Sequence, residues 1–91
     1  MAETWALLAY RIPREPSAPR VTVWRKLRRL GAVQIVDGLV ALPATPEAIE
    51  AFDWIAEEVL EAGGEAWTWR ATGPKAQDRA LRQRLKELVA K

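Results

Sequence analysis

The first hydrophobic segment of the chain is continuous rather than alternating, and it predicts a buried strand. It runs from Trp5 to Ile12 and ends at a proline. Apolar side chains occupy both odd and even positions, so both faces of this strand need cover. A loop follows over residues 14–19, in which Ser17 is the expected N-cap of a helix.

A helix is predicted from this loop to about Leu30, and Gly31 is expected to end it. On a wheel of 3.6 residues per turn, apolar side chains share one side and basic side chains lie opposite. The predicted core side comprises Val23, Trp24, Leu27 and Leu30, and the basic side comprises Arg25, Lys26 and Arg29, with Arg28 at its flank.

Two short apolar segments follow, over residues 33–36 and 39–42, with Asp37-Gly38 between them. This dipeptide predicts a β-hairpin, because both of its residues tolerate a positive φ. A second helix is predicted from a Thr45 cap to the glycine pair at residues 63–64. Its expected core stripe comprises Ile49, Phe52, Ile55, Ala56, Val59 and Leu60.

The remaining pattern predicts a fourth strand over residues 66–69 and an amphipathic helix over residues 76–90. The order β-α-β-β-α-β predicts an α+β fold, a ferredoxin-like antiparallel sheet with an added C-terminal helix. We expect residues 1–75 to form this domain, and residues 76–91 to belong to it or to act as a dimer arm. Right-handed crossovers place the first two helices on one sheet face. The last helix or another subunit must cover the other face.

Composition narrows the chemistry that this chain can perform. Ninety-one residues form one small domain, and the sequence contains neither cysteine nor histidine. Their absence removes disulfides, thiol nucleophiles, the commonest metal ligand and the commonest acid–base group. We therefore expect no enzymatic activity, no catalytic residues, no metal and no cofactor. The N-terminus is acidic and precedes no long apolar segment, which favours a cytoplasmic protein without membrane contact.

The net charge of +2 is distributed in blocks along the chain. Residues 11–29 carry seven Arg and Lys against one acid, and residues 45–65 carry seven acids and no base. Residues 70–91 carry seven bases against two acids. Such blocks can attract a polyanion or a complementary protein surface, but a solvated helix face is the simpler interpretation of any one block.

The first predicted helix is the candidate for binding anions. Exposed basic side chains along it suit the phosphates of duplex DNA, which position a protein without specifying sequence. The candidate nucleic-acid-binding residues are Arg20, Arg25, Lys26, Arg28 and Arg29. Alternatively, the helix N-terminus and nearby guanidinium groups suit a small oxyanion. The candidate residues for that site are Arg11, Ser17 and Arg20.

Two further features suggest a protein interface. Trp54 falls at the centre of the acidic face of the second helix, and an exposed tryptophan often marks a contact surface. The last helix has a narrow leucine stripe flanked by bases. The candidate interface residues are Trp54, Leu81, Leu85 and Leu88. Burial within the same chain is the alternative for each of them.

Several segments share their order and spacing with a known family. They are Trp5–Ser17, Arg20-Val21, Val23–Ala32, Asp37-Gly38, Leu42-Pro43, Phe52–Glu58 and Gly63–Ala66. In these segments the sequence resembles the N-terminal domain of the chromate-resistance regulator ChrB. The resemblance implies a cytoplasmic regulator or sensor of a chromate-efflux operon, which binds operator DNA through the basic segment and responds to chromate.

The resemblance has one departure, because regulators of this family carry a further C-terminal domain and this sequence ends at Lys91. We expect either one domain of a longer protein or a stand-alone relative. A weaker similarity links the domain to the ferredoxin-like modules of phenylacetate-type repressors and CRISPR adaptation nucleases, which dimerise through sheets. The nuclease carboxylate at the end of the first strand is replaced here by Arg11-Ile12-Pro13.

We therefore predict a non-enzymatic, homodimeric regulatory domain that contacts duplex DNA through its first helix. One alternative is a protein-interaction or dimerisation module without affinity for nucleic acid. The other is a domain that binds chromate, sulfate or another small oxyanion.

Overall fold

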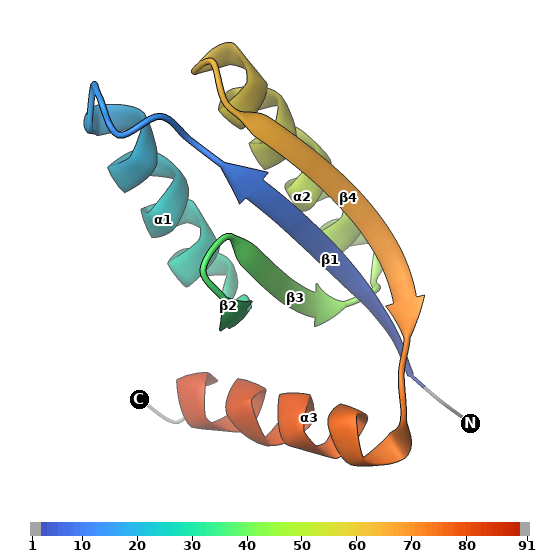
Figure 1. The fold of residues 1–91 in the computed structure, drawn as a ribbon. Coiled ribbons are helices and arrows are strands. Elements are labelled where there is room, and N and C mark those ends of the chain that lie inside the picture. Colours follow the sequence, from blue (N-terminus) through green and yellow to red (C-terminus); the bar gives the residue numbers. More distant parts are fainter. Residues whose placement is uncertain (1–2, 90–91) are drawn as a thin grey trace.

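The computed structural model describes residues 3–89 as a four-stranded antiparallel sheet with three helices (Figure 1). The strands are β1 (Thr4–Arg11), β2 (Val33–Val36), β3 (Leu39–Pro43) and β4 (Glu65–Thr72), and the helices are α1 (Ala18–Leu30), α2 (Pro46–Glu61) and α3 (Lys75–Val89). The strand order is β2-β3-β1-β4, and every neighbouring pair is antiparallel. The predicted α+β fold and the β-α-β-β-α-β order are confirmed.

The boundaries differ from the prediction mainly in the last strand. β4 has eight residues rather than the four of segment 66–69, because it pairs with β1 along its whole length, from Thr4 opposite Thr72 to Arg11 opposite Glu65. The polar residues at its ends hide this length in the hydrophobic pattern. Residue 90, the predicted end of the last helix, lies outside the described residues.

Local signals explain where the helices and the hairpin begin. Ser17 holds the N-cap position of α1, but its side chain makes no capping hydrogen bond. Thr45 does cap α2, since its hydroxyl accepts a hydrogen bond from the N–H of Ala48 at 3.1 Å. Gly38 has a φ of 78°, and its carbonyl accepts a hydrogen bond from the N–H of Tyr10 at 2.8 Å. That bond ties the hairpin turn to β1.

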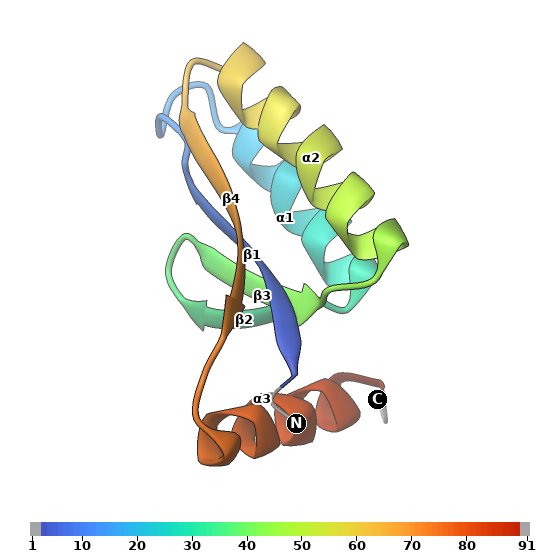
Figure 2. The ribbon, with the colours of Figure 1, turned by 90° about the vertical axis from the view of Figure 1, so that its right-hand side faces the viewer.

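The main core lies between the sheet and the pair of helices α1 and α2, which cover one face of it (Figure 2). Its buried side chains are Ala6, Leu8, Val23, Leu27, Val40, Leu42, Ala48, Phe52, Ile55 and Val59. Three residues predicted for this core are instead exposed. Trp24 is 51% exposed, and Leu30 and Leu60 also face solvent. The short β2 leaves the Trp24 side of α1 uncovered, and Leu30 and Leu60 lie in the last turns of their helices.

The third helix covers part of the opposite sheet face, as one of the two predicted arrangements required. Leu81 of α3 is buried in a second cluster with Trp5, Val33 and Ala41. Figure 1 shows α3 crossing one end of the sheet, below the hairpin. In the described part of the chain, no helix lies over the rest of this face, which includes most of β4. Within residues 3–89, no helix is both long and apolar enough to span a bilayer.

Polar contacts fix α3 to the first strand. The Asp78 carboxylate accepts hydrogen bonds from the N–H of Glu3 at 3.0 Å and from Nε1–H of Trp5 at 2.9 Å. Arg82 forms an ion pair with Glu3, and its guanidinium carbon lies 5.8 Å from the centroid of the Trp5 ring. The two hydrogen bonds hold the pKa of Asp78 below its ordinary value.

We expect the stability supplied by Asp78 to be lost in acid. Because its folded pKa is depressed, this contribution is complete above the unfolded pKa of about 3.9 and disappears as pH falls through the folded value. Asp78→Ala should lower the urea midpoint at neutral pH and flatten its decline below about pH 4. The matched control is Glu87→Ala, an exposed carboxylate on the same helix. Equal urea midpoints and pH profiles for the two variants would contradict the docking role of Asp78.

Candidate nucleic-acid interface

The outward side of α1 carries three exposed arginines, Arg25, Arg28 and Arg29, which form no ion pair within residues 3–89. Arg25 and Arg29 are four residues apart and therefore lie one turn above each other on the same side. The guanidinium carbon of Arg28 lies 5.0 Å from the centroid of the Trp24 ring, which is a cation–π contact. We call these three residues the arginine face.

Lys26 was predicted with these arginines, but the structure places it elsewhere. It is half-buried and forms an ion pair with Glu58 of α2. Lys26 therefore helps to fix α1 against α2, which presents the arginine face from a packed scaffold.

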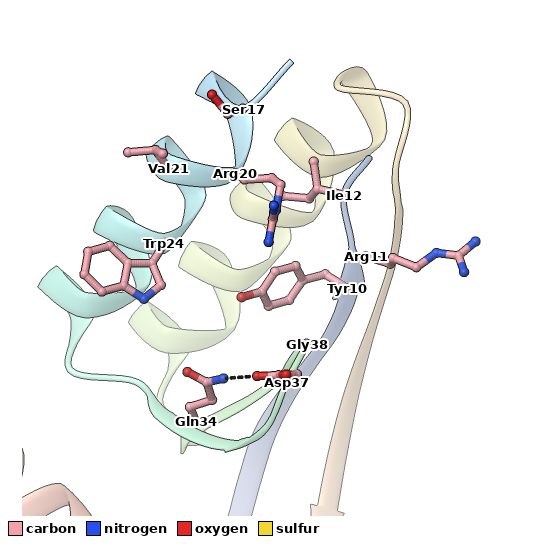
Figure 3. A pocket seen from close by; sticks show the side chains of 10 residues that line it. All are labelled: Tyr10, Arg11, Ile12, Ser17, Arg20, Val21, Trp24, Gln34, Asp37 and Gly38. Carbon is pink, nitrogen blue, oxygen red and sulfur yellow. Dashed lines mark hydrogen bonds between the residues drawn. The ribbon is translucent and has the colours of Figure 1, made fainter. Parts of the chain in front are cut away.

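A groove of about 770 Å³ lies beside the arginine face, between the start of α1, the end of β1 and the β2–β3 hairpin (Figure 3). The side chain of Arg20 points from α1 toward the Tyr10 ring, and Trp24 forms the outer wall. On the hairpin, the amide of Gln34 donates a hydrogen bond to the Asp37 carboxylate at 3.0 Å.

The groove contains a positive side chain, Arg20, and a negative one, Asp37, near the phenol of Tyr10. Burial raises the pKa of Tyr10, the negative charge of Asp37 raises it further, and Arg20 opposes them. The hydroxyl therefore remains protonated at neutral pH and can donate or accept a hydrogen bond. Asp37 offsets the attraction that Arg20 offers to an anion.

All three residues predicted for an oxyanion site border the groove, and two of them, Ser17 and Arg20, lie on its α1 side. The guanidinium of Arg11 points away from both, to the other side of β1 (Figure 3), where it lies 3.3 Å from the carboxylate of Glu65. A small anion in the groove would therefore meet one arginine rather than two.

Comparison with known proteins identifies the family of this chain. The family model for the N-terminal region of protein ChrB matches residues 20–90, which include most of α1 and the whole arginine face. The chain belongs to the ChrB N-terminal domain family. Protein ChrB of Cupriavidus metallidurans (strain CH34) is 30% identical over 63 residues, which cover 69% of this chain and 19% of that protein. The chain thus spans about a fifth of the length of this curated relative. No solved structure matches the chain.

The predicted interface residues of this ChrB-family domain do not form one surface. Trp54 is 64% exposed on the outer side of α2, so the described part of α3 does not cover it. Leu81 and Leu85 lie on the side of α3 that faces the sheet of the same chain, where Leu81 is buried and Leu85 is partly buried. Leu88 is exposed at the far end of the helix.

Sequence reasoning missed two exposed tryptophans of the ChrB-family domain. Trp67 and Trp69 of β4 are 62% and 59% exposed. They stand two residues apart, so they share one sheet face, opposite the helices α1 and α2. The signal was the alternating Trp67-Thr68-Trp69, which places a large apolar side chain twice on the same face.

Proposed function

We propose that this ChrB-family domain is a non-enzymatic regulatory domain of chromate resistance that contacts duplex DNA through α1. The observation that carries the proposal is the arginine face, in which Arg25, Arg28 and Arg29 project from one packed helix without an ion pair in residues 3–89. Guanidinium groups form paired hydrogen bonds with phosphate oxygens, and each neutralised phosphate releases counterions.

The packing of α1 supports this role because it fixes the direction in which the arginines point. Val23 and Leu27 are buried on the opposite side of the helix, and Lys26 is tied to Glu58. The helix that carries the arginines is therefore fixed in place before DNA arrives. Phosphate contacts of this kind set position and affinity but carry no sequence information.

The charge on α2 supports one orientation of the bound duplex. Within residues 3–89, the exposed carboxylates of α2 form no ion pair with the arginine face: they are Glu47, Glu50, Asp53, Glu57 and Glu61. A polyanion approaching the domain is repelled from that surface and attracted to α1. The opposite charges of the two helices therefore favour approach of the duplex from the α1 side.

Charge reversal of the arginine face tests the proposal. We expect Arg25→Glu with Arg29→Glu to weaken binding to a short duplex by about 100-fold at low salt, because two charged hydrogen bonds to phosphate are replaced by repulsion. Fluorescence anisotropy of a labelled duplex measures the affinity. The urea midpoint should change little, since both side chains are exposed.

The matched control is Arg79→Glu with Lys86→Glu, which makes the same change in net charge at two exposed positions of α3. This control should lose no more than a few-fold in affinity through general repulsion. Equal losses in the two double variants would show that net charge, rather than the arginine face, governs binding. Undiminished binding by the α1 variant would also refute the proposal.

A further inference from the structure

The sheet face opposite α1 and α2 is covered by α3 only at one end. Beyond that end, Trp67 and Trp69 lie on the open face of β4, 62% and 59% exposed. Their register partners on β1 are Ala9 and Leu7, which are partly buried. These four side chains form a continuous apolar patch. Such a patch at the margin of a small domain is typical of a protein contact surface.

The patch borders an unprotected sheet edge. β4 is the last strand of the sheet, so its outer backbone groups have no strand partner along eight residues within the described chain. Natural edge strands are usually blocked by proline, lysine, bulges or very short length. β4 has no proline, lysine or bulge, and its two charged residues, Glu65 and Arg70, lie outside its central Trp67-Thr68-Trp69 segment. The Trp and Thr residues of this segment favour extended structure. The other edge, β2, has four residues and is contacted by Arg84 of α3.

We propose that β4 pairs antiparallel with β4 of a second copy of this chain, about a two-fold axis through Thr68. A two-fold axis perpendicular to the sheet keeps both open faces on one side, so paired positions must share a face. With Thr68 opposite itself, Trp67 faces Trp69 of the second copy and Trp69 faces Trp67. Four tryptophans then pack together across the junction, where aromatic cross-strand pairs stabilise a sheet.

The sequence of β4 is self-complementary about Thr68, which favours a second copy of this chain over an unrelated partner. Arg70 lies on the helix side of the sheet, in a hollow that also contains Asp53 of the same chain's α2. In the proposed register Arg70 lies across from Ala66 of the second copy, and Glu65 lies across from Ala71. No like charges therefore face each other across the pair, where they would oppose it.

The available surface is of the right order for a dimer. A tryptophan side chain presents about 250 Å², so the two exposed fractions leave about 300 Å² per copy. A stable interface buries about 800 Å² on each partner, and the paired backbone and flanking residues of β4 supply the rest. The same symmetry puts both copies of α1 on one side of an eight-stranded sheet. The dimer itself does not depend on the proposed DNA contact.

The mass of the protein in solution tests the pairing without DNA. Sedimentation equilibrium should show a dimer for the unmodified chain, and Trp67→Lys with Trp69→Lys should raise the dissociation constant by about 100-fold. Lysine on an edge strand opposes pairing, and here four lysines would meet. The matched control is Trp54→Lys, since Trp54 is equally exposed but lies on α2. This variant should remain dimeric.

A second variant keeps the test decisive if circular dichroism shows that the double tryptophan variant is unfolded. Thr68→Lys should weaken the dimer about tenfold, because this exposed residue lies opposite its own copy on the two-fold axis and like charges would meet there. A monomeric unmodified protein at all concentrations would overturn the proposal. So would a dimer that survives the changes on β4 but dissociates with Trp54→Lys, because the acidic face of α2 would then be the interface.

Discussion

Phe52→Ala is expected to lower the free energy of unfolding by about 4 kcal/mol. Phe52 is 1% exposed and lies between α2 and the sheet, where it contacts both strands and helices of the main core. Removal of its ring leaves a cavity that the sheet cannot close. A domain of this size has a total stability of about 5 to 10 kcal/mol, so the variant should be close to unfolded. Urea unfolding followed by far-ultraviolet circular dichroism measures the difference.

The matched control is Trp54→Ala, which removes a larger ring two residues further along the same helix. Trp54 is exposed, so the free energy of unfolding should change by no more than about 0.5 kcal/mol. Equal losses at the two positions would mean that α2 presents a different side to the sheet. Trp54 would then belong to the core.

Gly64→Ala is expected to destabilise the domain by about 3 kcal/mol. A Cβ atom at this position would lie 2.2 Å from the backbone oxygen of Arg11 and 2.9 Å from Cγ1 of Val59. A backbone atom cannot rotate away as a side chain can, so the start of β4 must move from the end of β1. Chemical denaturation measures the loss.

The preceding glycine provides the control for Gly64→Ala. Gly63 has a φ of 84°, but no atom lies within 4 Å of a Cβ built there. Gly63→Ala should therefore cost only about 1 kcal/mol, the penalty for a left-handed conformation. If Gly63→Ala is the more damaging of the two, backbone conformation rather than close packing governs this turn.

The order of the elements could be predicted because several boundaries have a local cause, whereas the length of β4 is set by its pairing with β1. The Asp37-Gly38 turn and the Thr45 cap act through neighbouring residues, and both are found where the sequence places them. Burial depends instead on what packs above a residue. A helical wheel places Trp24 beside Val23 and Leu27, but it contains no information that β2 is too short to cover that side.

The candidate sites show the same division between local and tertiary causes. The sequence places Lys26 among the arginines, but its partner Glu58 is thirty-two residues away in the chain. Arg11 is different, because its direction follows from the alternation of a strand. It has the same parity as Trp5 and therefore points to the face opposite Tyr10. The two-residue period of a strand therefore predicts that the side chains of Arg11 and Arg20 do not share one site.

The most direct test of the account is the salt dependence of duplex binding by the unmodified domain and by Arg25→Glu with Arg29→Glu. If three arginines contact phosphates, the logarithm of the association constant should fall with the logarithm of salt concentration with a slope of about −3. The variant should show a slope shallower by about two units. Binding that is absent at low salt, or slopes that are the same for both proteins, would contradict the assignment of DNA contact to α1.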